Sequence, residues 1–219
     1  AFGLYYLYLP TFRFRDDLIC GDRTLRSMGD VVGLTVTSSF DGMYRVIDAI
    51  EAHGYVNLVR GPMEFGPRAM CNTSTLALPT KANVERINRA NDRNTVMPMA
   101  PAMTRDMYAS LFLYSERLWR SESHMITALE YKDTVPEHLR GIAHAYKHPF
   151  QHETGRPQVI DDTDMFLRRI IQHFSSPLIN TSFNFHGQPI AFDMPSVIHN
   201  HRLQRQRDPQ IQTVVIHNG

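Results

Sequence analysis

Apolar side chains recur three and four positions apart in several parts of the chain, which is the repeat of an amphipathic helix. The first such part is residues 39–53, where Ser39 or Asp41 can cap the helix and Gly54 can end it. The same repeat predicts further helices, from Thr80 to about Ala90, from Thr104 to about Leu118, from Asp162 to Phe174, and a short one over residues 196–201.

Runs of β-branched and other apolar residues lie between these helices and predict strands. They cover residues 31–36, 55–60, 74–78, 124–132, 156–160, 177–180 and 213–216. The segment over residues 92–101 contains Pro98 and Pro101 and is expected to be irregular, because proline cannot donate to a strand ladder. Helices and strands alternate without a strict order, so the pattern predicts one α/β or α+β domain.

Composition narrows the class of protein. The chain has 219 residues, 42% hydrophobic and 21% charged, which is typical of a globular protein with a sizeable core. The formal net charge is +1, so no global field would attract nucleic acid or an anionic membrane. No apolar run approaches the ~20 residues of a spanning helix. Cys20 and Cys71 are too few for a disulfide framework, which favours a cytoplasmic location.

The stretch Arg60–Met70 combines repeated Gly and Pro with charge, so it cannot be a helix interior or a central strand. Glycine lets a backbone approach a ligand, and arginine offers a planar fork for phosphate or carboxylate. Two interpretations remain open from this stretch alone. One is a loop that holds an anion, and the other is a structural turn pinned by an arginine–glutamate pair.

Two other polar stretches are less specific. His144, His148 and His152 are four positions apart, but Pro149 interrupts the helix that a metal site would need, so no metal site is expected. The basic run Arg202–Arg207 has no interleaved aromatic residues, which favours a solvated surface over nucleic-acid binding.

Five ordered segments resemble a known family. They are Met63–Ala69, Asn88–Pro101, Arg156–Val159, Leu178–Asn184 and Gly187–Ile190. Their order and spacing resemble the C-terminal half of O-carbamoyltransferases of the antibiotic and nodulation-factor type. The resemblance implies a YrdC-like α/β (α+β) fold, a twisted mixed sheet flanked by helices, over residues 39–219. Residues 1–38 would be the end of, or the connection to, an N-terminal actin-like domain.

The family's chemistry supplies further expectations. Its YrdC-like half forms carbamoyl-adenylate from ATP, with Mg²⁺, and carbamoyl phosphate. Its actin-like partner domain then moves the carbamoyl group to a hydroxyl of a small-molecule acceptor. By resemblance, Arg68 and Arg156 are the catalytic phosphate clamps, since two polyanions must be held together. The residues expected to bind the nucleotide or the carbamoyl group are Arg93, Ser74, Asn180, Ser182 and Asn184.

Three positions depart from the family pattern. Asn91 stands where the family has lysine, and Met97 and Thr73 stand where it has arginine. Each such loss removes a charge-assisted hydrogen bond worth about 1.5–3 kcal/mol. A non-catalytic YrdC-like scaffold, or a nucleotide- or RNA-binding domain, is therefore the alternative to an enzyme.

Overall fold

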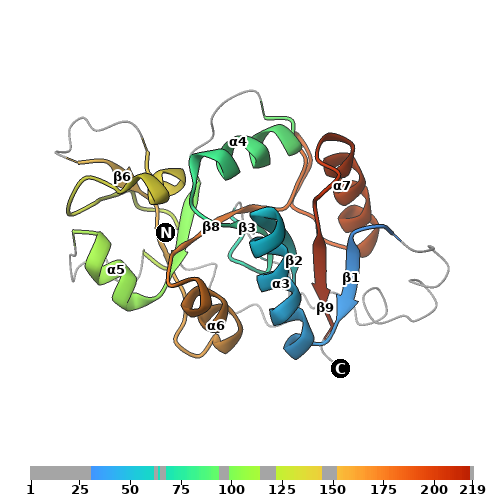
Figure 1. Cartoon of the computed structure of the whole chain (residues 1–219), viewed down its shortest axis with the longest axis horizontal. Coiled ribbons are helices and arrows are strands. Elements are labelled where there is room, and N and C mark those ends of the chain that lie inside the picture. Colours follow the sequence, from blue (N-terminus) through green and yellow to red (C-terminus); the bar gives the residue numbers. More distant parts are fainter. Residues whose placement is uncertain are drawn as a thin grey trace.

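One mixed β-sheet organises the described part of the chain, which in this computed structural model comprises residues 31–61, 64, 68–93, 99–113, 122–144 and 152–217. Within these residues, seven strands pair in the order β1-β9-β2-β3-β8-β4-β7 (Figure 1). β1 and β2 run parallel to β9, and β4 runs parallel to β7, whereas β3 and β8 are antiparallel to both of their neighbours. The strands are β1 (Leu34–Thr37), β2 (Tyr55–Val59), β3 (Thr73–Ala77), β4 (Ala100–Met103), β7 (Gln158–Val159), β8 (Leu178–Ser182) and β9 (Thr213–Ile216).

Helices flank this sheet, and a small second sheet lies beyond its β7 edge (Figure 1). The second sheet pairs β5 (Leu129–Glu130) with β6 (Thr154–Gly155). The helices of the described residues are α3 (Ser39–His53), α4 (Lys81–Ala90), α5 (Arg105–Leu111), the 3₁₀-helix η3 (Glu137–Ile142), α6 (Met165–Phe174) and α7 (Met194–Arg207).

The central strand β2 divides the core between the two faces of the sheet. All five of its residues are buried. Val56 and Leu58 pack with apolar residues of α3 and α6, whereas Tyr55 packs with residues of α4 and η3. Val59 packs with residues of α7. Because successive side chains of a strand point to opposite faces, β2 holds helices against both sides of the sheet.

The expected helices over residues 39–53 and 162–174 are confirmed, but their N-caps were misassigned. The Ser38 hydroxyl accepts from the N–H of Asp41 (3.3 Å), so Ser38 caps α3 rather than Ser39 or Asp41. Asp164, not Asp162, caps α6 by accepting from a first-turn N–H (3.1 Å). The helix that follows Thr80 and the strands at residues 55–60, 74–78 and 213–216 agree with the structure to within one or two residues.

One correction concerns Ala100 and Pro101, the end of the segment 92–101 that was expected to be irregular. Ala100–Met103 forms β4, an inner strand of the main sheet, with Pro101 opposite Ile179 of β8. Its parallel contact with β7 begins only at Ala102, one residue after the proline. The missing proline N–H therefore does not interrupt the β4–β7 ladder.

Two helices also have different lengths from those expected. α5 ends at Leu111, because Phe112 adopts a β conformation and bridges to Tyr131. The expected continuation to Leu118 lies outside the described residues beyond position 113. α7 is longer than the predicted 196–201 segment, since it spans 14 residues and includes the basic run.

Candidate functional site

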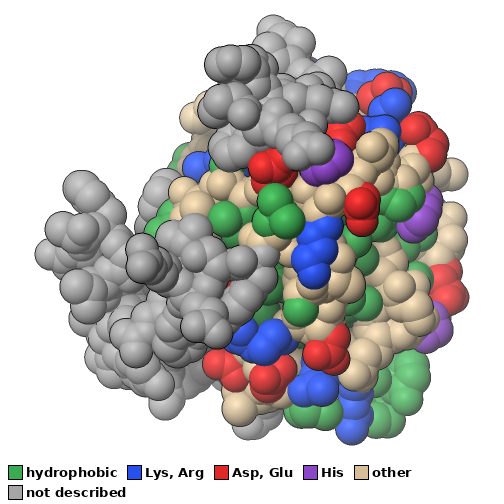
Figure 2. Space-filling model, turned by 90° about the vertical axis from the view of Figure 1, so that its left-hand side faces the viewer, with side chains coloured by type: hydrophobic (Ala, Val, Ile, Leu, Met, Phe, Trp, Pro, Cys, Tyr) green, Lys and Arg blue, Asp and Glu red, His purple; other side chains and the backbone are tan. Residues whose placement is uncertain are grey.

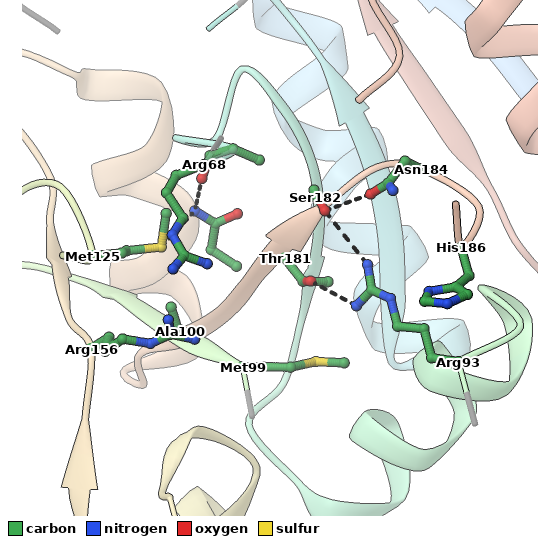
Figure 3. Close-up of a pocket in the computed structure, with 12 residues that line it drawn as sticks. Arg68, Arg93, Met99, Ala100, Met125, Arg156, Thr181, Ser182, Asn184 and His186 are labelled. Carbon is green, nitrogen blue, oxygen red and sulfur yellow. Dashed lines mark hydrogen bonds between the residues drawn. The ribbon is translucent and has the colours of Figure 1, made fainter. Parts of the chain in front are cut away.

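A cavity of about 250 Å³ opens where the segment before β3, the start of β4 and the end of β8 meet (Figure 3). Its lining is rich in cations and hydrogen-bonding groups. The lining residues are Arg68, Ala69, Arg93, Met99, Ala100, Met125, Arg156, Asn180, Thr181, Ser182, Asn184 and His186. Of the seven site residues expected from the sequence, the structure brings six to this one cavity and leaves Ser74 outside its lining.

Glu64 holds the segment that leads into β3. Its carboxylate Oε1 accepts from the backbone N–H groups of Met70 (2.7 Å), Asn72 (2.8 Å) and Thr73 (3.0 Å). The carboxylate is buried, with 6% of the residue exposed. Ser74 adds to this anchor, because its buried hydroxyl accepts from the N–H of Cys71 (2.9 Å). Ser74 thus supports the segment beside the cavity from within the sheet.

The stretch Arg60–Met70 is not held in place by the arginine–glutamate pair that its sequence suggested. Arg60 forms a bidentate ion pair with Asp164 instead, with Nη1 3.0 Å from Oδ1 and Nη2 bonded to Oδ2. Its Nε also donates to the carbonyl of Cys71 (2.9 Å). Arg60 is therefore a structural residue, which leaves Arg68 to line the cavity.

Arg68 and Arg156 form the most strongly cationic part of the cavity. Figure 3 shows both guanidinium groups on the same side of it. Burial and the nearby charge of Arg68 lower the pKa of Arg156. No acidic residue among those described pairs with Arg156, and its buried Nε has no hydrogen-bond partner. The positive charge of Arg156, held close to that of Arg68, favours a bound anion.

Arg93 supplies a third cation at the other side of the cavity. It donates to the hydroxyls of Thr181 (3.2 Å) and Ser182 (3.5 Å), and burial lowers its pKa. The Ser182 hydroxyl in turn donates to Asn184 Oδ1 (2.5 Å). Figure 3 places the His186 imidazole beside Arg93. The sequence interpretation missed His186, although it lies between the polar cluster that ends at Asn184 and the glycine motif at residue 187.

Asn180 lies almost completely buried in the cavity wall, with 2% of its surface exposed. Its Nδ2 donates to the carbonyl of Ala69 (2.8 Å) and to Gln158 Oε1 (2.5 Å). Its Oδ1 is buried and has no hydrogen-bond partner among the described residues. Asn180 therefore keeps an acceptor that no described group uses, in the wall of a cavity that three arginines also line.

Of the positions that depart from the family pattern, the two that the structure describes do not line the cavity. Asn91 does not line the cavity and is only 1% exposed. Its Oδ1 accepts from Gln204 of α7 (2.6 Å), and its carbonyl accepts from the N–H of His186 (2.8 Å). Asn91 therefore supports the cavity wall from behind. Thr73 is buried in β3, and Met97 lies outside the described residues.

The basic run acts within the fold, and the three spaced histidines are only partly described. The described residues contain no group of His, Cys, Asp and Glu arranged to hold a metal ion, and His148 lies outside them. Arg205 donates to the Ile211 carbonyl (2.7 Å), and Arg207 pairs with Asp92 (2.6 Å), so both act within the fold. Figure 2 shows acidic and basic side chains interspersed over the coloured part of one face. Among the helices described, none is long and apolar enough to cross a bilayer.

The arrangement of sheet and helices is a YrdC-like fold. It resembles a variant of Sua5 from P. abyssi, with a TM-score of 0.55 and 13% identity over 84% of this chain and 52% of that one. Sua5 complexed with L-threonine gives a TM-score of 0.55 and 13% identity over 85% and 50%. HypF in its phosphate- and nucleotide-bound form gives 0.52 and 13%, over 81% of this chain and 25% of that one.

The sequence identifies the family within this class. Residues 47–217 match the carbamoyltransferase C-terminus family, and the chain belongs to it. It is 35% identical to the uncharacterised protein MJ1051 of Methanocaldococcus jannaschii, over 66% of this chain and 28% of that protein. It is 30% identical to MJ1058 of the same organism, over 62% and 22%. The chain thus spans about a quarter of the length of these relatives. The expected family and the expected fold are both confirmed.

Proposed function

We propose that this chain is the part of an O-carbamoyltransferase that forms carbamoyl-adenylate from ATP and carbamoyl phosphate. The observation that carries the proposal is the approach of Arg68 to Arg156 in the cavity, where Arg156 has no acidic partner among the described residues. Such a pair is suited to phosphate oxygens, which accept the parallel N–H groups of guanidinium. Membership of the carbamoyltransferase C-terminus family supports the choice of substrate.

The proposed reaction needs charge stabilisation more than it needs a nucleophilic side chain. Water first cleaves carbamoyl phosphate to carbamate and phosphate. A carbamate oxygen then bonds to the α-phosphorus of ATP while the bond to the β-phosphate oxygen breaks, so pyrophosphate leaves. Arg68 and Arg156 would offset the negative charge that gathers on the phosphoryl oxygens. Magnesium would arrive with the nucleotide, since Mg²⁺ is commonly held by substrate phosphates and water.

Cys71 fits a structural role beside this reaction. The residue is fully buried, and burial raises the pKa of its thiol, so the thiol stays protonated. Its Sγ donates to Gln158 Oε1 (3.3 Å). A protonated, enclosed thiol is a poor nucleophile, which agrees with a reaction that forms no covalent intermediate with the protein.

The remaining polar residues have distinct proposed roles. Arg93, oriented by Thr181 and Ser182, would contact the nucleotide phosphates. Asn184 would hold Ser182 in place for the same ligand. Asn180 would meet the carbamoyl group, as argued below, and Ser74 would support the segment next to Arg68 through its bond to Cys71.

Transfer to the acceptor hydroxyl is assigned to a partner. We infer that residues 1–38 are the end of, or the connection to, an actin-like domain, and that residues 39–219 form the YrdC-like unit. The actin-like domain would receive carbamoyl-adenylate and transfer its carbamoyl group to a small molecule. The proposed substrates and the free thiol of Cys71 favour a cytoplasmic protein.

Exchange of labelled pyrophosphate into ATP tests the proposal. The chain, alone and together with its partner domain, is incubated with MgATP and labelled pyrophosphate, with and without carbamoyl phosphate. We expect exchange only when carbamoyl phosphate is present, and loss of exchange in Arg156→Ala. Arg169→Ala, an exposed arginine on α6, is the matched control and should exchange like the wild type. ATP binding without any exchange would overturn the enzyme proposal in favour of a non-catalytic nucleotide-binding domain.

A further inference from the structure

The orientation of the Asn180 amide is fixed by groups whose polarity is unambiguous. A backbone carbonyl can only accept, so the contact with Ala69 O (2.8 Å) identifies Nδ2. The second Nδ2 hydrogen goes to Gln158 Oε1 (2.5 Å). Both hydrogens of the amide are therefore used within the protein. What Asn180 can offer a ligand is the acceptor Oδ1, which is buried and has no partner in the part of the chain that the structure describes.

Gln158 enforces this orientation. Its own amide is fixed by a second backbone carbonyl, because Nε2 donates to Met70 O (3.1 Å). Oε1 must then face Asn180, where it also accepts from Cys71 Sγ (3.3 Å). Gln158 is 5% exposed and does not line the cavity, so it acts on a ligand only through Asn180. A rotated Asn180 amide would place two oxygens against each other at Gln158 and at Ala69, which is unfavourable in a buried site.

We propose that Gln158 is a positioning residue that makes this site selective for acyl phosphates carrying an N–H donor. The inference rests on the proposed function and assigns its substrate selectivity. The amino group of carbamoyl phosphate donates to Asn180 Oδ1, while Arg68 and Arg156 hold the oxygens of the same ligand. Acetyl phosphate has a methyl group in place of the amino group. It would leave Oδ1 buried and unpaired.

The size of the preference follows from that unpaired acceptor. A site built around a hydrogen bond rejects the analogue that lacks it, because the buried group loses its only partner. One such bond corresponds to about tenfold to hundredfold in affinity. The phosphate groups of the two ligands are the same, so the arginines contribute equally to both.

Titration calorimetry on the full chain tests the inference with three probes: carbamoyl phosphate, acetyl phosphate and inorganic phosphate. We expect the wild type to bind carbamoyl phosphate about tenfold to hundredfold more tightly than acetyl phosphate. Equal affinities would overturn the inference and leave the proposed function standing. Failure of the wild type to bind any of the three probes would overturn both.

A substitution at Gln158 separates positioning from mere support of the fold. Gln158→Met keeps the length of the side chain but removes its three polar contacts, so the Asn180 amide loses one of the two acceptors that fix its orientation. The ratio of the two acyl phosphate affinities should fall by at least about threefold, because an Asn180 amide held only by the Ala69 carbonyl presents Oδ1 to the ligand less strictly. A purely structural defect would lower the amount of binding-competent protein equally for all probes and leave this ratio unchanged. An unchanged ratio would therefore overturn the assignment of Gln158 as a positioning residue. Gln172→Met, at an exposed position of α6, is the matched control and should keep the wild-type ratio.

Discussion

Arg60 and Asp164 are joined by a bidentate ion pair that ties the end of β2 to the first turn of α6. Both side chains are mostly buried, at 17% and 22% exposed. The Arg60 guanidinium also lies over the ring of Phe166, 5.2 Å from its centre. Arg60 also donates a hydrogen bond to the carbonyl of Cys71. The ion pair therefore connects α6 with the segment that lines the cavity.

Removal of the Asp164 carboxylate should therefore destabilise the protein. Asp164→Ala loses the ion pair and the N-cap of α6, and it leaves the mostly buried Arg60 guanidinium without its carboxylate partner. We expect the free energy of unfolding to fall by about 2–3 kcal/mol, measured by urea denaturation. Asp162→Ala is the control, since Asp162 is 65% exposed and lies 3.5 Å from Arg168. It should cost less than about 1 kcal/mol. Equal losses in both variants would contradict the assignment of the cap.

Arg68→Ala separates a binding arginine from a structural one. We expect the affinity for inorganic phosphate and for carbamoyl phosphate to fall by about tenfold to hundredfold, because a charge-assisted contact is lost. The melting temperature should remain nearly unchanged. Calorimetry and thermal unfolding measure the two effects. A large drop in melting temperature with binding retained would show that Arg68 is structural.

His201 should make the fold sensitive to acid. Its Nδ1 lies 2.8 Å from the Thr213 hydroxyl and its Nε2 3.0 Å from the Val32 carbonyl. Burial, together with the charges of Arg205 and Arg202, lowers its pKa despite the bond to Val32. The unfolded chain therefore takes up the proton first as the pH falls.

Stability contributed by neutral His201 is present above the ordinary histidine pKa of about 6.5 and is lost as the pH falls toward the lower folded value. Urea denaturation at pH 7.5 and pH 5 should show a loss of stability that is smaller in His201→Gln. Burial and Arg156 lower the pKa of His144 in the same direction, so His144→Gln is measured in parallel. An unchanged pH dependence in His201→Gln would exclude this role for His201.

The buried Cys71 thiol should react slowly with thiol reagents. A Cys20→Ser variant leaves Cys71 as the remaining cysteine. Its labelling in native protein should be at least about a hundredfold slower than in urea, since the thiol is enclosed and protonated. Rapid native labelling that abolished pyrophosphate exchange would instead support a nucleophilic role. Mass spectrometry provides the time course.

Much of the fold could be predicted from local pattern, and the misses share one cause. The helix at 39–53 and the strand at 55–60 follow from apolar spacing and from Gly54, which is left-handed at φ 85° as a helix end requires. β4 was missed because Pro101 argues against a strand, and the structure resolves this through the staggered contact with β7. Which neighbour a strand meets, and at which residue, is not a local property.

The candidate site, like the fold, could be predicted from the sequence only where it depends on local motifs. Arg68 and Arg156 could be proposed from their motifs, which lie 88 positions apart in the sequence. That they lie close together, and that Asp164 rather than Glu64 pairs with Arg60, depends on contacts between distant elements. Gln158 could not have been singled out, because its importance lies in three hydrogen bonds to Met70, Cys71 and Asn180.

The Glu64 anchor has a consequence for the thermodynamics of ligand binding. One carboxylate oxygen gathers three backbone N–H groups between Met70 and Thr73, directly after two of the cavity-lining residues. This backbone is ordered before any ligand arrives, so little conformational entropy has to be lost on association. Affinity at such a preorganised site depends on a carboxylate that does not line the cavity. Glu64 would then set the entropy of binding, while the arginines set its enthalpy.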